Sequence, residues 1–387
     1  MKLDRRVALV GLAASATAPA FAWGVPRSSR WAAIEDKAQA MINDRLAPGL
    51  QICVTRRGSV VFSRAFGQAN LETNTSMTPA SDCRIGSITK QFTAAGILLL
   101  VQDGKLALDD SLGRFLPDFP HAERLSLRRM LNHTSGLGDY TETKPPDLFL
   151  QESRPDRTTA QLVDVMRKSS GTLIFEPGEK WGYSNTAYVL LGVVIEKVTG
   201  RPWAEFLTTR LFKPLGLTHT AIDDAAEVVL GRATGYSNDP KAPSGFDNAS
   251  FVSMTYPGGA GAICSTAEDL CAWHAGLLGG RVLRPAMLAA MLTPAKLNDG
   301  SLPTMPGDRL TPLRYGLGVV LEPIGGRAAV SHNGGIQGFT SYLSTLLEEQ
   351  LTVATIINTD GGAESPPALE SAPGELRNAI RAAALAA

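Results

Sequence analysis

The sequence predicts an α+β fold in which one antiparallel sheet is built from both ends of the chain. Near the N-terminus, residues 51–55 and 60–64 are rich in β-forming side chains and flank a short turn, which is the pattern of a β-hairpin. Near the C-terminus, β-rich segments separated by turns cover residues 315–321, 328–331, 340–344 and 351–357. Between these two groups, residues 107–300 have mostly helical patterns, and we expect them to form a second lobe.

Helices are expected before, between and after the strands. Residues 30–45 have the pattern of a helix that ends before Pro48, and residues 375–386 predict a terminal helix. Shorter helical patterns within the lobe cover residues 125–131, 159–169, 187–198 and 203–211. We expect a single domain over residues 30–387, with a site in the cleft between sheet and lobe, where ligands commonly bind.

The composition favours a globular protein with no nucleic-acid partner. Of the 387 residues 44% are hydrophobic, which is ample for a buried core. Lys+Arg and Asp+Glu balance at 37 each, and no basic stripe is present. No transmembrane segment is expected, because apolar runs beyond the first 22 residues are too short to cross a bilayer. The sequence does not indicate an oligomeric state.

The first 22 residues have the pattern of a signal peptide. Basic Lys2, Arg5 and Arg6 precede the apolar residues 7–14, and Ala-Phe-Ala at 20–22 matches a cleavage site. We therefore expect a periplasmic or secreted protein that is cleaved near Ala22. The arginine pair permits a twin-arginine route, although its flanking residues match that signal poorly.

The cysteines leave the presence of disulfides open. An exported protein could pair them, and two of them could lie on neighbouring turns, but free buried cysteines are equally consistent with the sequence. The four are Cys53, Cys83, Cys264 and Cys271. No Cys or His spacing resembles a zinc site and no Gly-x-Gly-x-x-Gly motif occurs, so neither a metal nor a cofactor is expected.

A candidate nucleophile, Ser87, precedes a largely apolar helix that ends near residue 103. Lys90 follows three residues later, which places it on the same helical face. A serine at a helix start, with an amine nearby to take its proton, is an activated nucleophile. No other lysine of the chain has a serine three residues before it. The alternative is that Ser87 only caps the helix and Lys90 is solvated.

A second candidate group is Tyr183 with Asn185, in a loop between Pro177-Gly178 and an apolar helix. The phenol could face the cleft and the amide could bind substrate. The tripeptide Tyr-Ser-Asn recurs at residues 236–238 without that context, and there we prefer a turn.

A third candidate group follows an apolar strand at residues 328–331. His332, Asn333, Gly334 and Gly335 stand there, and glycines allow a substrate to lie close to a strand edge. Of the five histidines, only His332 is singled out.

These motifs in this order resemble the serine β-lactamase and penicillin-binding protein superfamily. The nearest branch contains class C β-lactamases, D-alanyl-D-alanine carboxypeptidases, D-aminopeptidases and family VIII esterases. The resemblance covers nearly everything after residue 30 and implies a β-lactamase/transpeptidase-like fold. Besides the three groups, it rests on residues 131–137, 177–178, 257–259 and 265–270.

The resemblance implies roles for each group. Ser87 would be acylated, and Lys90 with Tyr183 would move its proton. Asn185 would orient the substrate, and the backbone N–H groups of Ser87 and Gly335 would form the oxyanion hole. Residues 332–334 would contact substrate.

One departure from class C β-lactamases bears on the substrate. Those enzymes carry Lys-Thr-Gly where this chain has His332-Asn333-Gly334, so a fixed charge and a hydroxyl that bind a carboxylate are missing. The sequence therefore predicts an exported serine hydrolase acting on esters or amides, either an esterase or a D-peptidase-like enzyme. We expect short-chain esters to react faster than cephalosporins.

Other functions remain as alternatives. A class C-type β-lactamase is one, and β-lactams and short D-residue peptides both stay open as substrates. A non-catalytic penicillin-binding or sensor protein is another, but such proteins typically lose the serine, lysine or tyrosine. An α/β-hydrolase would carry Gly-x-Ser-x-Gly, which is absent.

Overall fold

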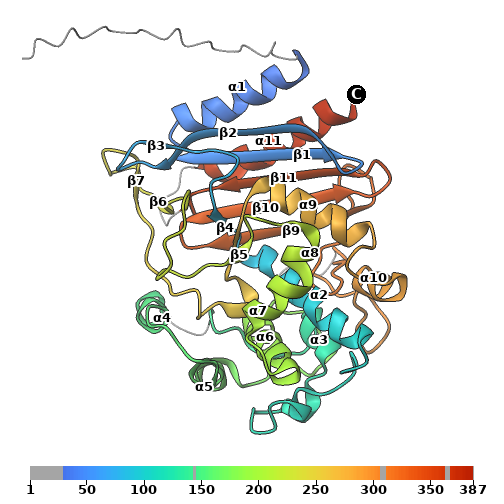
Figure 1. Cartoon of the computed structure of the whole chain (residues 1–387). Coiled ribbons are helices and arrows are strands. Elements are labelled where there is room, and N and C mark those ends of the chain that lie inside the picture. Colours follow the sequence, from blue (N-terminus) through green and yellow to red (C-terminus); the bar gives the residue numbers. More distant parts are fainter. Residues whose placement is uncertain (1–28, 143–144, 306–310, 362–366, 387) are drawn as a thin grey trace, which may run out of the picture.

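The computed structural model describes residues 29–142, 145–305, 311–361 and 367–386. The predicted signal peptide lies outside the described residues. Six strands form the main sheet in the order β3-β2-β1-β11-β10-β9 (Figure 1). Their bounds are β1 Gly49–Arg56, β2 Ser59–Asn70, β3 Thr75–Ser76, β9 Ala329–Ile336, β10 Phe339–Leu346 and β11 Leu351–Ile357. Strand β1 pairs antiparallel with both β2 and β11, so both chain ends build the sheet as predicted.

Helices cover both faces of this sheet. Helices α1 and α11 pack together on one face, and α9 packs on the other (Figure 1). Successive side chains of β1 point to opposite faces of the sheet. Leu50, Ile52 and Val54 pack in the hydrophobic cluster under α1 and α11, whereas Cys53 packs in the larger core on the other face. The bounds are α1 Ser29–Asn43, α9 Ala267–Leu278 and α11 Pro367–Leu385.

The second lobe is mostly helical and is organised around α2 and α6. Both helices are buried almost all round, which is typical of helices inside a core. The helices are α2 Thr89–Gln102, α3 Leu127–Leu131, α4 Pro146–Ser153, α5 Thr159–Ser170, α6 Asn185–Thr199, α7 Trp203–Leu207, α8 Lys213–Leu215 and α10 Pro285–Met291. Short helical turns are η1 Gly86–Ile88, η2 Leu112–Arg114, η3 Ala122–Arg124, η4 Thr208–Phe212 and η5 Gly258–Ala260. The predicted limits of this lobe, 107 and 300, stay a prediction.

Five further strands are short. They are β4 Cys83–Arg84, β5 Ala221–Ile222, β6 Tyr236–Asn238, β7 Phe246–Asn248 and β8 Ile263–Ser265. They form one three-stranded sheet and one two-stranded sheet. All four cysteines are free and buried. Within the described ranges, no helix combines the length and the apolar character needed to span a membrane.

The turn η1 packs directly against strand β9. Gly86 has a φ of 50°, and a Cβ added there would lie 2.7 Å from the Gly335 carbonyl oxygen. A Cβ on Gly334 would collide with the Ile85 carbonyl oxygen, which also accepts a hydrogen bond from Ser341 Oγ at 2.8 Å. The glycines therefore bring the start of α2 against the sheet edge.

Two predicted elements differ from the structure. Residues 315–321 form only isolated bridges, because Gly318 adopts a φ of 78° and packs so closely that an added Cβ would lie 3.0 Å from the Lys90 carbonyl. The strand predicted at 328–331 instead runs on through the glycine pair as β9, because β10 pairs with it as far as Ile336.

Candidate functional site

Ser87 and Lys90 form the centre of the candidate site. Ser87 lies in η1, the 3₁₀ turn immediately before α2, rather than in the α-helix itself. The Lys90 Nζ lies 3.0 Å from Ser87 Oγ, within reach for proton transfer. Ser87 is partly exposed, whereas Lys90 is completely buried. The hydroxyl can therefore meet a substrate while the amine beside it is shielded from water.

Burial makes Lys90 a usable base near neutral pH. Desolvation lowers the pKa of its amine to about 7, and the negative charge of Asp139 acts in the opposite direction. Near that pH a large fraction of the amine is neutral and can take the Ser87 proton. Two further oxygens hold Nζ in place: Asn185 Oδ1 at 2.7 Å and the Ala260 carbonyl at 2.9 Å.

Asp139 fixes the orientation of the Asn185 amide. Its Oδ2 accepts hydrogen bonds from the backbone N–H and from Nδ2 of Asn185, both at 2.9 Å. Its Oδ1 accepts from the backbone N–H and the hydroxyl of Thr141, both at 2.8 Å. The amide nitrogen must therefore face Asp139, which leaves its oxygen for Lys90.

His133 holds the two residues that flank Tyr183 in the chain. The Gly182 N–H donates to the His133 carbonyl at 2.9 Å, and the Ser184 N–H donates to His133 Nδ1 at 3.1 Å. The imidazole and phenol centroids are 4.3 Å apart. Burial lowers the pKa of His133 well below its ordinary value, so Nδ1 is free to accept. His133 was not predicted as a site residue, although it lies within residues 131–137, on which the resemblance partly rests.

The Tyr183 phenol stays protonated near neutral pH. Burial raises its pKa above the ordinary value, and a hydrogen bond with the Ser87 side chain only partly opposes this shift. The Lys90 Nζ lies 4.8 Å from the centroid of the same ring. The site therefore combines a hydroxyl, an amine that can accept its proton and a phenol that can donate one.

A cavity of about 460 Å³ opens in front of Ser87 and is large enough for a small substrate. Asn185 and Gly335 both line it. A Cβ added at Gly335 would meet no atom within 4 Å, so this stretch of backbone borders open space. An aromatic cluster of Tyr140, Phe149 and Tyr256 also lines the cavity. The oxyanion hole predicted at Ser87 and Gly335 stays a prediction.

The other predicted substrate contacts lie outside this lining. His332 is only 2% exposed, and its Nε2 lies 2.9 Å from the Tyr315 hydroxyl. Burial lowers its pKa to about 4, so it is neutral at pH 7. Asn333 is exposed, and Gly334 packs on Ile85. Direct contact of these residues with substrate stays a prediction.

Comparison with known proteins identifies the family. A family model described as Beta-lactamase matches residues 34–373. The chain belongs to this family. It is 30% identical to penicillin-binding protein 4* of Bacillus subtilis over 325 residues, covering 81% of this chain and 68% of that protein. The match confirms the β-lactamase/transpeptidase-like fold that the resemblance implied.

Two further matches are named D-aminopeptidase and D-amino acid amidase. A D-aminopeptidase of Brucella anthropi is 31% identical over 323 residues, covering 82% of this chain but 57% of that protein. The chain thus spans little more than half of that relative. The D-amino acid amidase structure from Ochrobactrum anthropi SV3 matches with a TM-score of 0.75 and 27% identity, covering 90% of this chain and 99% of the other.

The second Tyr-Ser-Asn tripeptide, residues 236–238, is a structural element away from Ser87. It forms β6 rather than the predicted turn, and Tyr236 is 3% exposed. The Tyr236 hydroxyl accepts a hydrogen bond from the Leu71 backbone N–H at 2.8 Å. This copy lies outside the lining of the Ser87 cavity.

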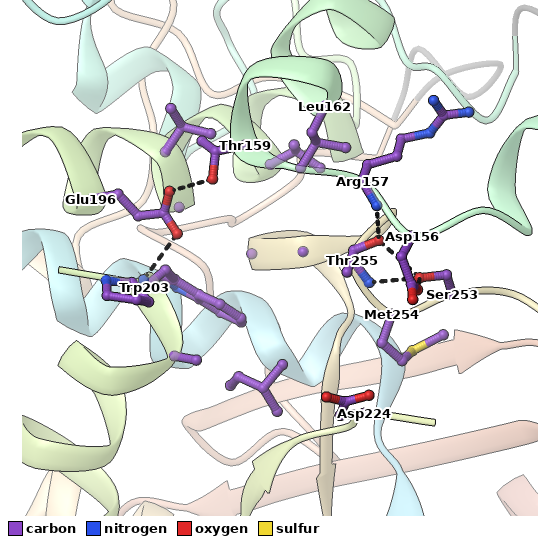
Figure 2. Close-up of a pocket in the computed structure, with 18 of the residues that line it drawn as sticks. Asp156, Arg157, Thr159, Leu162, Glu196, Trp203, Asp224, Ser253, Met254 and Thr255 are labelled. Atoms are coloured by element: carbon purple, nitrogen blue, oxygen red, sulfur yellow. Dashed lines mark hydrogen bonds between the residues drawn. The ribbon is translucent and has the colours of Figure 1, made fainter. Parts of the chain in front are cut away.

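A second cavity, of about 320 Å³, is drawn in Figure 2 with most of the residues that line it. Leu162, Trp203 and Met254 line it with apolar surface, and Gly258 and Gly259 of η5 complete it. The next residue, Ala260, lines the Ser87 cavity instead. The turn η5 therefore contributes residues to both cavities.

Several polar groups of the second cavity hydrogen-bond to one another. Glu196 accepts from the Thr159 hydroxyl at 2.7 Å and from the Trp203 backbone N–H at 3.0 Å (Figure 2). The Ser253 hydroxyl donates to Asp156 at 2.5 Å. Ser253, the one serine among the described residues that line this cavity, hydrogen-bonds to Asp156 and Thr255 and not to a lysine amine, so it does not repeat the Ser87–Lys90 pair.

The two Tyr-Ser-Asn copies give a matched pair of variants. Tyr183→Phe should lower kcat/KM about 10²- to 10⁴-fold, the usual cost of losing a general acid or base. Tyr236→Phe should leave kcat/KM close to wild type and lower only thermal stability, because it removes the acceptor of the Leu71 N–H. Ester hydrolysis and thermal melting of both variants test this, and the reverse pattern would show that Tyr236 is the catalytic copy.

The lowered pKa of Lys90 predicts a pH profile. With an uncharged ester, kcat/KM should rise with pH and level off above an inflection near 7, because only the neutral amine accepts a proton. Below the inflection the slope should be about tenfold per pH unit. A profile that is flat between pH 5 and 9, after subtraction of spontaneous hydrolysis, contradicts Lys90 as the base.

Proposed function

We propose that this chain is a D-peptidase- or amidase-like hydrolase that cleaves amides and esters of D-amino acids through an acyl-enzyme on Ser87. The observation that carries the proposal is the buried Lys90 amine, 3.0 Å from a partly exposed Ser87 hydroxyl. The names of the relatives, D-aminopeptidase and D-amino acid amidase, support the choice of substrate.

The proposed reaction has two halves. The Ser87 oxygen attacks the substrate carbonyl carbon while its proton passes to the neutral Lys90 amine. The backbone N–H groups of Ser87 and Gly335 stabilise the oxyanion, and the phenol of Tyr183 protonates the departing amine or alkoxide. Water then attacks the acyl-enzyme carbonyl and gives a proton to the Tyr183 phenolate, and Lys90 returns its proton to the Ser87 oxygen as the acid is released.

Two features support amino acid derivatives over β-lactams. His332 is buried and uncharged at pH 7, so it supplies no fixed charge for a substrate carboxylate. The aromatic cluster of Tyr140, Phe149 and Tyr256 can accept an aromatic or aliphatic side chain. Esters remain predicted substrates, because the same acylation serves both bond types.

The substrate proposal is tested by three assays on the purified chain. D-phenylalanine p-nitroanilide should be hydrolysed at least about tenfold faster than the L-isomer, and a p-nitrophenyl ester faster than a chromogenic cephalosporin. The expected discrimination matches one contact of about 1.4 kcal/mol or more. Ser87→Ala should abolish all three activities. Preference for the cephalosporin, or equal rates for both isomers, would contradict the proposal.

We also propose that the chain is exported and cleaved after Ala22. Support comes from the basic, apolar and small-residue pattern of residues 1–22. N-terminal sequencing of protein from a periplasmic fraction should begin at Trp23. The variant Leu9→Glu, which interrupts the apolar region, should stay uncleaved inside the cell. An intact Met1 on cytosolic wild-type protein would count against export.

A further inference from the structure

Asp360 brings a negative charge to the wall of the cavity that holds Ser87. It follows β11 and lines the cavity together with Gln337 and Gly335. Of the described lining residues, Asp360 alone carries a carboxylate, and no arginine or lysine accompanies it there. The nearby Lys90 amine is already bound by three oxygens. The cavity wall is therefore suited to a positive rather than a negative substrate group.

Among the described residues, the Asp360 carboxylate accepts hydrogen bonds only from uncharged donors. Its Oδ2 accepts from the Gly338 backbone N–H at 2.9 Å and from the Ser237 hydroxyl at 3.2 Å. Its Oδ1 is buried and has no hydrogen-bond partner within the described part of the chain. A buried carboxylate oxygen without a donor is costly, so a donor supplied by a ligand would be bound strongly.

We propose that Asp360 binds a cationic amine on the acyl part of the substrate and makes the site selective for unprotected amino acid derivatives. The proposal deepens the proposed function and rests on it for the identity of the site. The Cβ–Cγ torsion of an aspartate is broad, so the carboxylate can turn to present an oxygen to the cavity that Asp360 lines. An ammonium there gains a charge-assisted hydrogen bond that an N-acylated or amine-free substrate cannot make.

Asp360 also supports the hairpin that joins β9 to β10, and the test must separate the two roles. Gly338, with a φ of 82°, lies at the hairpin tip and donates to Asp360, and Gly335 lies in the same hairpin. Asp360→Asn keeps a side-chain oxygen for the Gly338 N–H but removes the charge. Ser237→Ala removes a hydrogen bond to the same carboxylate but keeps the charge, so it is the matched control.

The experiment measures binding by calorimetry in the Ser87→Ala background, where no acyl-enzyme forms. The probes are D-phenylalanine amide and 3-phenylpropionamide, which differ only in the amine. At pH 7 that amine is mostly protonated, since α-amino groups titrate near about 7.7–8.0. We expect D-phenylalanine amide to bind about 10- to 100-fold more tightly, the usual range for a hydrogen bond to a charged group.

Asp360→Asn should abolish this preference and leave the affinity for 3-phenylpropionamide unchanged, whereas Ser237→Ala should keep the preference. The proposal would be overturned if the Ser87→Ala protein bound both amides equally, or if the preference survived Asp360→Asn. It would also be overturned if Asp360→Asn weakened the binding of both amides equally. Because no turnover is needed, failure of amide hydrolysis by the wild type would count against the proposed function and not against this binding role.

Discussion

The burial of one lysine amine determines how the site is assembled. The oxygens around Lys90 Nζ come from three separate segments: the turn η1, the first residue of α6 and the turn η5. A buried amine needs all of these partners, since an unpaired donor in the core costs about 1–3 kcal/mol. The same burial lowers its pKa to about 7. Packing and reactivity therefore have a common cause.

The sequence predicted the groups whose partners are close in the chain. Ser87 and Lys90 are one helical turn apart, so their contact follows from local geometry. Asp139 had no such signal, because it meets Asn185 only after the chain has travelled through α4 and α5. Asp360 meets Gly338 at the tip of the β9–β10 hairpin and Ser237 in β6, both distant in sequence, and was missed for the same reason.

The main errors in the predicted fold also came from tertiary contacts. Residues 315–321 have strand propensity, yet Gly318 turns the chain to lie on α2 and no partner strand pairs with them in full. Conversely, the glycine pair at 334–335 suggested the end of a strand, but pairing with β10 carries β9 past it. The predicted class of fold was right because the β-rich patterns near both chain ends, which form β1, β2, β10 and β11, were strong enough.

The order of strands in the sheet bears on how this protein can fold during synthesis. β1 lies between β2 and β11, and Leu50 pairs with Ile357. At about 5–20 residues per second, the ribosome needs on the order of 15–60 s to make the chain between these partners. Until then one edge of the N-terminal hairpin is unpaired and Ser87 has no β9 beside it. The centre of the sheet and the candidate site therefore form only after the ribosome has passed Ile357.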